Sequence, residues 1–201
     1  MTHVPLTSEF FTGEPATCAA QLIGMEFRWR GCGGIIVETE AYAAVGDPAC
    51  HTFFRKGARA FVRDQHPGTA YIYLNYGVHW LFNVLVKGGA SDGFVLLRAL
   101  EPTLGIRGMA SRRPASPEPL LCAGPGRLTR ALGIVGASHG ADFLAAAPAT
   151  GIFRAAGLQA PVLADRRIGI SKGVDLPWRF LLAGSPALSR RPGPSSIMLI
   201  A

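Results

Sequence analysis

Charged residues and cysteines are both scarce in this sequence. Asp, Glu, Lys and Arg make up 16% of the 201 residues, against about 25% in an average globular protein. The four cysteines form no CxxC pair, and no histidine stands at zinc-finger spacing from them. These absences argue against a structural zinc site and against a disulfide framework. Because 49% of the residues are apolar, the chain is long enough for one core. We expect a single domain over residues 1–201 in the reducing cytoplasm.

Targeting signals are also missing. Glu9 and Glu14 precede the first Lys or Arg, which does not fit the basic start of a secretory signal. One uncharged stretch, Gln65 to Val86, has 22 residues and so has the length of a membrane span. Asn75 and Gly77 interrupt it, and such residues mark tight turns. We therefore predict a buried β-hairpin here and no association with a membrane.

Several catalytic motifs are absent as well. The sequence has no HExxH, no P-loop and no GxGxxG, which removes zincin, nucleotide-hydrolase and dinucleotide-binding functions. Residues 136–140 fit the GxSxG pattern of a serine hydrolase. That motif needs a strand before it and a triad histidine after it, and the last histidine of the chain is His139. We interpret the segment as a glycine-rich loop.

The charge that is present is unevenly distributed. Residues 1–50 carry two basic and six acidic side chains, and the remaining 151 residues carry eighteen basic and seven acidic ones. An excess of cations over one part of the chain favours a polyanionic partner.

The pattern of apolar residues predicts one α+β domain with a curved, mostly antiparallel β-sheet, surrounding helices and a protruding β-hairpin. Residues 43–69 show weak periodicity and are predicted to be a long loop with room for one helical turn. A basic linker is expected over 112–119. The predicted helices span 14–23, 103–111 and 127–132, and the predicted strands span 27–30, 35–42, 70–75, 79–86, 94–100, 151–154, 168–170 and 178–182.

Two acidic side chains stand out on the strand over 35–42. With a period of two, Glu38, Glu40 and Tyr42 share one face. Two carboxylates this close are neighbours rather than groups on either side of a scissile bond, so we expect one catalytic residue. The other is as readily an ion-pair partner. Arg98, in the apolar run 94–100, needs such an acidic or carbonyl partner when buried.

Tyr76 occupies the tip of the predicted hairpin, next to Gly77. Packing partners are scarce at such a tip, whereas Tyr71 and Tyr73 on the strand are more readily explained by packing. An aromatic side chain on a rigid tip beside a cationic loop is suited to insertion into a stack of bases.

Taken in order, many short motifs together resemble the alkyladenine (3-methyladenine) DNA glycosylase family. The resemblance runs from about residue 6 to residue 189. It departs from the family pattern at Thr52–Lys56 and Val62–His66. The matching pieces are Ile36–Tyr42, His51, Pro67-Gly68, Tyr71–Tyr73, Tyr76-Gly77, Asn83, Leu96–Pro102, Gly124-Pro125 with Leu128, Arg167–Ile170 and Pro177–Phe180.

The resemblance implies a monofunctional base-excision-repair enzyme. Such an enzyme rotates a damaged purine out of double-stranded DNA and hydrolyses its N-glycosidic bond. The substrates implied are 3-methyladenine, 7-methylguanine, hypoxanthine and ethenoadenine. No lysine falls at a site position, so no Schiff-base step is expected. The water mechanism needs no metal and no organic cofactor, and the family resemblance favours a monomer.

The resemblance also implies roles for individual residues. Glu40 is the implied general base, and Arg98 with the main chain near Ile168 holds the attacking water. Tyr76 fills the gap left in the duplex. The base pocket is formed by Tyr42 and His51, which enclose the flipped base, by Tyr73 at the pocket edge and by Asn83, which rejects the exocyclic amine of guanine. The implied DNA-backbone contacts are Arg55, Lys56, Arg59, Arg127 and Arg130.

Two other functions remain open from the sequence. Because the loop over 52–66 departs from the family pattern, the chain could be a non-catalytic DNA-damage-binding domain of the same fold. A hydrolase of free nucleosides is the third alternative, although it would leave Tyr76 and the basic excess without a use.

Overall fold

The computed structural model describes residues 4–154 and 161–199, and its architecture is the predicted α+β one. All ten strands within these residues join in one sheet that is not closed into a barrel, and every strand pairing is antiparallel. The main strand order is β1-β7-β2-β3-β6-β5-β4, and β9, β8 and β10 branch from β3. The strands are β1 (Val4–Pro5), β2 (Glu26–Trp29), β3 (Cys32–Ala43), β4 (Ala70–Asn75), β5 (His79–Val86), β6 (Gly93–Leu104), β7 (Gly151–Arg154), β8 (Val162–Asp165), β9 (Arg179–Leu182) and β10 (Ile197–Leu199).

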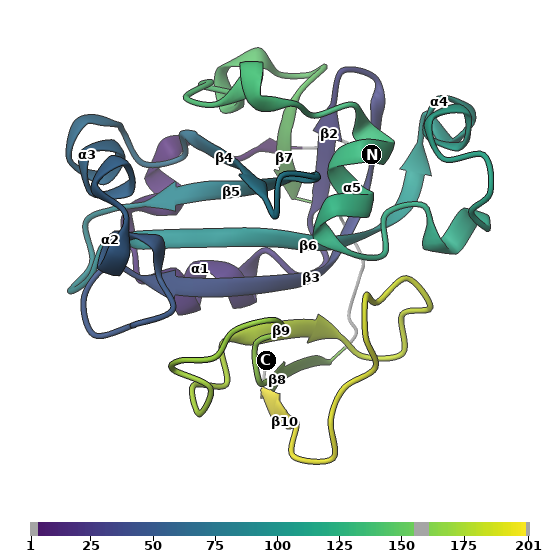
Figure 1. The fold of residues 1–201 in the computed structure, drawn as a ribbon. Helices are drawn as coiled ribbons and strands as arrows, with labels where there is room; N and C mark the ends of the chain where they lie inside the picture. Colours follow the sequence, from purple (N-terminus) through teal and green to yellow (C-terminus); the bar gives the residue numbers. More distant parts are fainter. Residues whose placement is uncertain (1–3, 155–160, 200–201) are drawn as a thin grey trace.

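The branch exists because β3 has two successive partners along one of its edges. β6 pairs with β3 over residues 33–43, β2 pairs with residues 32–35, and β9 pairs with residues 38–40. Register shifts between Ile36 and Thr39 separate the two short pairings, and such irregularities bend a strand. In Figure 1, β2 and β7 accordingly run steeply across the direction of β3, β5 and β6. This bend produces the curvature that the sequence predicted.

Five α-helices and four short 3-10 helices surround the sheet in the described residues. The first α-helix begins at Pro15 and α5 begins at Pro125. Proline is well tolerated at the first helical position. The α-helices are α1 (Pro15–Gln21), α2 (His51–Phe54), α3 (Lys56–Asp64), α4 (Ile106–Arg112) and α5 (Pro125–Leu132), and the 3-10 helices are η1 (Ser8–Thr12), η2 (Glu118–Leu120), η3 (Gly136–Ser138) and η4 (Leu144–Ala146).

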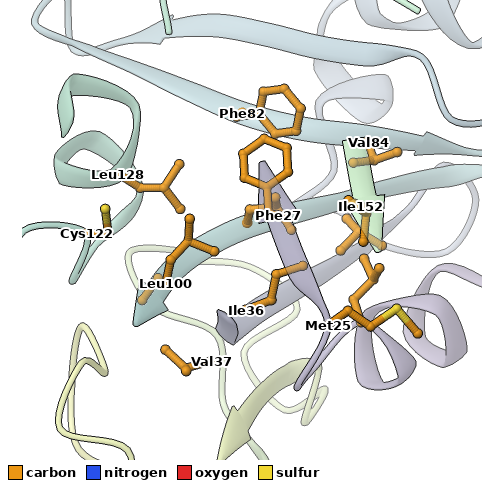
Figure 2. Close-up of a cluster of buried hydrophobic side chains, with 14 of the residues drawn as sticks. Met25, Phe27, Ile36, Val37, Phe82, Val84, Leu100, Cys122, Leu128 and Ile152 are labelled. Atoms are coloured by element: carbon orange, nitrogen blue, oxygen red, sulfur yellow. The ribbon is translucent and has the colours of Figure 1, made fainter. Parts of the chain in front are cut away.

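The main core lies at the bend of the sheet. The rings of Phe27 on β2 and Phe82 on β5 are 5.1 Å apart between centroids, and Leu128 of α5 points toward Leu100 of β6 (Figure 2). All four side chains are fully buried. Burial of one such side chain contributes about 1.5–3 kcal/mol, so this cluster holds α5 against the strands.

Residues 43–69 are not the predicted long loop, because they contain α2 and α3. On α3 the buried residues Ala58, Phe61 and Val62 follow the helical i, i+3, i+4 spacing. They pack with Tyr71 and Phe94 in a second, smaller apolar cluster. That tertiary contact stabilises a nine-residue helix that would be marginal alone.

Two further boundaries were wrong. The predicted strand over 168–170 is a bend, and the strand of that region is β8 instead. The predicted helix over 103–111 begins only at Ile106, because β6 continues to Leu104. Gly105 ends β6 with a φ of 68°, and a Cβ there would lie 2.3 Å from the carbonyl oxygen of Gly31. Only glycine fits that turn.

The uncharged stretch from Gln65 to Val86 contains the β4–β5 hairpin, as predicted. Within the residues described, no helix has the length and apolar character needed to cross a membrane. The GxSxG segment holds the short helix η3 and has no strand directly before it, in line with its interpretation as a loop.

Candidate active site

Strands β3 and β6 bring both predicted carboxylates to Arg98. The Nε of Arg98 donates to Glu38 Oε1 at 2.8 Å, and its Nη1 donates to Glu40 Oε2 at 3.2 Å. Both glutamates are fully buried and Arg98 is 7% exposed. The prediction that a buried Arg98 needs an acidic partner is therefore confirmed, with two partners in place of one.

Both carboxylate oxygens of Glu38 are hydrogen-bonded to neighbouring residues, so neither is open to a ligand. Its Oε1 also accepts from Arg179 Nε at 2.8 Å and from the hydroxyl of Ser189 at 2.7 Å, and its Oε2 accepts from the Ser189 main-chain N–H at 2.6 Å. Burial alone would raise the pKa of Glu38, but Arg98, Arg179 and Ser189 together outweigh it and hold the pKa below the ordinary value. Glu38 is thus an ion-pair partner.

Glu40 has a different environment. Its Oε1 accepts from the Ile168 main-chain N–H at 2.7 Å, and its Oε2 accepts from the Tyr42 hydroxyl at 2.7 Å as well as from Arg98. These three donors line the large pocket of the protein, whereas Glu40 lies directly behind them. Arg98 and the main chain of Ile168, which were expected to hold a water, contact the carboxylate itself.

The pocket has a volume of about 810 Å³, within the range of sites for small organic groups. Its lining includes His51, Tyr73 and Asn83 from the predicted base pocket, and Tyr76, Arg127 and Arg130 near them. The structure thus brings together residues that are far apart in the sequence. Among the described residues, no group of three or more His, Cys, Asp or Glu side chains could hold a metal ion.

His51 is the first residue of α2 and contacts two tyrosines. Its Nδ1 is 3.0 Å from the Tyr71 hydroxyl, and its ring centroid is 4.2 Å from that of Tyr73. Burial, and secondarily the charge of Arg55, lowers the pKa of His51 to about 4. The imidazole is consequently neutral at physiological pH.

Tyr42 and Asn83 are held in fixed orientations. Burial, with Glu40 next in importance, raises the pKa of Tyr42 well above its ordinary value, so Tyr42 stays a neutral phenol that donates to Glu40. The Arg167 guanidinium lies 4.7 Å from the centroid of the Tyr42 ring. The side-chain amide of Asn83 donates to the Tyr71 carbonyl at 3.1 Å and is buried.

Tyr76 is 87% exposed at the tip of the β4–β5 hairpin. The turn has a hydrogen bond from the Val78 N–H to the Asn75 carbonyl, and its central residues Tyr76 and Gly77 have φ values of 49° and 71°. Positive φ at both central positions is typical of a type I′ turn. A bulky residue there is strained, and such strain is concentrated at functional sites.

The predicted backbone-contacting cations fall into two groups. Arg55, Lys56 and Arg59 are exposed around α3 but do not line the pocket, and Arg59 donates to the Thr52 carbonyl at 2.7 Å. Arg127 and Arg130 are exposed on α5 and do line it. Both groups are accessible to a large anionic partner.

Sequence reasoning missed several residues at the pocket. Phe53 and Phe54 line it, and each is 59% exposed. The buried ion pair between Asp47 and Arg167 lies beside it. Phe53 and Phe54 belong to α2, whose four residues are too few to show a helical period. Nothing local in the sequence connects Asp47 with Arg167.

Comparison with known proteins identifies the class of this protein as that of the DNA glycosylases. Residues 9–186 match the family model described as "Methylpurine-DNA glycosylase (MPG)". Because this match takes in most of the chain, the protein belongs to the methylpurine-DNA glycosylase family, and its substrate is DNA.

Similar proteins occur in several bacteria. The chain is 46% identical to a protein of Nitrobacter winogradskyi over 92% of this chain and 88% of that protein. It is 42% identical to one of Rhodopseudomonas palustris strain HaA2, over 92% and 90% of the two chains, and 44% identical to one of Rhizobium meliloti, over 92% and 98%. Each of these three proteins bears the name "Putative 3-methyladenine DNA glycosylase".

Proposed function

We propose that this protein is a monofunctional DNA-3-methyladenine glycosylase that uses water, activated by Glu40, to release damaged purines from duplex DNA. The observation that carries the proposal is the contact of Glu40 with Tyr42, Arg98 and Ile168, three residues that line a pocket of about 810 Å³. The proposed substrates are 3-methyladenine, 7-methylguanine, hypoxanthine and ethenoadenine. The names of the similar bacterial proteins support the first of these.

Base recognition in this proposal rests on stacking. The damaged nucleotide is extruded, its base enters between Tyr42 and His51, and Tyr73 bounds the pocket edge. Electron-poor alkylated purines stack well on neutral aromatic rings, and His51 is neutral at pH 7 because its pKa is lowered to about 4. Asn83 rejects normal guanine through its exocyclic amine.

The chemical step is hydrolysis of the bond between the base and the sugar. Water attacks C1′, Glu40 accepts its proton, and the bonding electrons leave with the purine. The carboxylate charge also stabilises the oxocarbenium character of the sugar. Because Glu40 lies behind its three donors, the step requires one of them to give way to the water when the base is bound.

The remaining partners follow from the same proposal. Tyr76 enters the gap in the duplex, and the exposed arginines bind phosphates. We propose that the protein acts as a monomer in the cytoplasm, as one domain, without a membrane partner, a metal or an organic cofactor.

One observation favours a second candidate, a non-catalytic DNA-damage-binding domain. Glu40 is fully buried and does not itself line the pocket, which includes Phe53 and Phe54 from the segment that departs from the family pattern. A protein of this kind would bind lesions and release no base.

A single-turnover assay separates these candidates. Duplexes carrying hypoxanthine, ethenoadenine or a methylated purine are incubated with the protein in EDTA and then treated with alkali, which cuts at abasic sites. The wild type should give alkali-dependent cleavage. Glu40→Gln should give none while binding the same duplex with similar affinity, because the amide cannot accept the proton of water.

The matched control is Glu101→Gln on β6, since Glu101 hydrogen-bonds Ser185 and does not line the pocket. It should retain activity. Base release by Glu40→Gln at the wild-type rate would remove Glu40 as the base, and binding without release by the wild type would favour the binding domain. Release from free nucleosides at a comparable rate would support a nucleoside hydrolase.

A further inference from the structure

A buried ion pair lies next to the pocket but has no part in the chemistry described above. Arg167 Nη1 donates to Asp47 Oδ2 at 2.5 Å, and Arg167 Nη2 donates to Asp47 Oδ1 at 2.8 Å. Both side chains are wholly buried. Arginine is suited to this bidentate geometry because its donors form a planar fork, which a lysine does not have.

The same guanidinium reaches three separate segments of the chain. Nη1 also donates to the carbonyl of Ala41, the residue between Glu40 and Tyr42 on β3, at 2.9 Å. Nη2 donates to the carbonyl of Gly173 at 3.0 Å. The four hydrogens of the two terminal nitrogens therefore fix β3, the Asp47 turn and the segment 167–173 relative to one another.

Each of these segments carries a group of the pocket. The residue after Arg167 is Ile168, whose N–H donates to Glu40. The Asp47 carboxylate accepts from the Ala49 N–H at 3.0 Å and thereby shapes the turn that leads into His51. The guanidinium also lies 4.7 Å from the Tyr42 ring and 5.4 Å from the Trp178 ring.

The pair is also closely packed from outside. Gly173 has a φ of 60°, and a Cβ added there would lie 2.9 Å from Arg167 Nη2 and 3.0 Å from Asp47 Oδ1. Any larger residue at position 173 would have to displace the pair. The position of the pair is thus fixed by its hydrogen bonds to the Ala41 and Gly173 carbonyls and by close packing against Gly173.

We infer that Arg167 and Asp47 are positioning residues that set the distance between Tyr42 and His51 and aim the Ile168 N–H at Glu40. The inference rests on the proposed function, because it assigns the pair to the pocket in which the extruded base is held. Neither residue lines the pocket, so both act through the groups that they hold. A misplacement of catalytic groups by about 1 Å costs on the order of 10²-fold in rate.

Three variants test the pair. Arg167→Lys keeps the charge but loses the bidentate fork, and Asp47→Asn keeps the shape but loses the charge. Gly173→Ala keeps both charges, while its new Cβ presses on the pair and its φ of 60° strains the backbone of the segment 167–173. The matched control is Arg28→Lys. Arg28 also pairs with a carboxylate, that of Glu26 at 2.7 Å, and also lies over an aromatic ring, that of Phe153 at 4.4 Å. It does not line the pocket.

The measurements separate positioning from folding. Circular dichroism and thermal unfolding fix a temperature at which each variant is folded, and single-turnover base release is measured there. A 2-aminopurine next to the lesion, which brightens when its neighbour leaves the stack, reports extrusion. We expect base release about 10²-fold slower in Arg167→Lys, Asp47→Asn and Gly173→Ala, a smaller 2-aminopurine signal, and unchanged affinity for undamaged duplex. Arg28→Lys should match the wild type in all three.

The possible outcomes are distinguishable. A wild type that releases no base overturns the proposed function, and this inference with it. If the wild type is active and folded Arg167→Lys and Gly173→Ala release base and extrude the lesion as it does, even with a lower melting temperature, the pair is only structural and the inference alone is overturned.

Discussion

Tyr76 combines a strained backbone conformation with an exposed aromatic side chain. A tyrosine with a φ of 49° is strained, and an aromatic ring that is 87% exposed gains little from folding. Neither property helps the free protein. Both are explained if the ring is held ready for insertion into a duplex, because a rigid tip loses little conformational freedom on binding.

Stability and binding should therefore respond in opposite directions to Tyr76→Asn. Asparagine tolerates positive φ, so the free energy of unfolding should rise by about 1 kcal/mol as this strain is relieved. Affinity for lesion-containing duplex should fall by about 1–3 kcal/mol, the value of one stacking contact. Urea unfolding and fluorescence anisotropy measure the two quantities. Tyr76→Phe, which keeps ring and strain, is the control; a loss of binding in both variants would argue against stacking.

His51 makes a prediction about pH. Its folded pKa of about 4 lies below the ordinary 6.5, so between these values the unfolded chain binds a proton that the folded protein does not. Stability from this group is complete above pH 6.5 and is lost as the pH falls toward 4. His51→Gln lacks this loss. The difference in unfolding free energy, wild type minus variant, should therefore decrease between pH 7 and pH 4.5 in urea titrations. A constant difference would show an ordinary histidine.

At the scale of elements, the bend in β3 decides which residues meet. The register shifts between Ile36 and Thr39 end the pairing with β2 and begin the pairing with β9. Glu38 and Glu40, which follow the first shift, meet Arg98, and Glu38 also meets Arg179. The hairpin β4–β5 and helix α5 also contribute to the pocket, through residues such as Tyr76 and Arg127.

Helix α5 should contribute to binding through its exposed face. If Arg127 and Arg130 each contact a phosphate, the double variant Arg127→Gln/Arg130→Gln should flatten the dependence of log K on log salt. The expected change in slope is about 0.9 for each lost contact, or about 1.8 in total. Anisotropy titrations at several salt concentrations measure it. Arg107→Gln on α4, exposed and away from the pocket, should keep the wild-type slope; equal slopes in all three proteins would exclude these contacts.

At the scale of the whole molecule, Arg179 joins the two parts of the sheet. It is 1% exposed, and it donates to Glu38 on β3 and to Asp165 on β8 at 2.8 and 3.0 Å. It also bonds the carbonyl of Arg190 in the C-terminal segment. The strands β8, β9 and β10 are therefore tied to the main sheet by buried charge as well as by β-pairing.

Removal of this cation should destabilise the whole fold. Arg179→Met leaves Glu38 and Asp165 buried without it, and the free energy of unfolding should fall by about 3–5 kcal/mol. Arg154→Met at an exposed position of β7 should change it by less than about 0.5 kcal/mol. Urea unfolding followed by circular dichroism measures both. Similar small losses in the two variants would mean that the network contributes little.

Local sequence patterns predicted those features that depend on a short stretch of residues. The interruption of the uncharged stretch by Asn75 and Gly77 located the β4–β5 hairpin and its turn. The apolar run 94–100 with one arginine predicted a buried cation and its need for a carboxylate. The same patterns missed α2 and α3, because those short helices are stabilised by packing on Tyr71 and Phe94 rather than by length.

The sequence by itself determined the α+β class, the face shared by Glu38, Glu40 and Tyr42, and the excess of cations, since these follow from backbone periodicity and composition. Only the tertiary structure decided that Glu38 is enclosed by Arg98, Arg179 and Ser189, whereas Glu40 is bonded by three residues that line the pocket. It also paired Asp47 with Arg167 across 120 positions. The reason is physical: a buried charge is stabilised by whichever opposite charge and N–H groups the folded chain brings within about 3 Å, and that choice depends on the bend of β3, which no local pattern encodes.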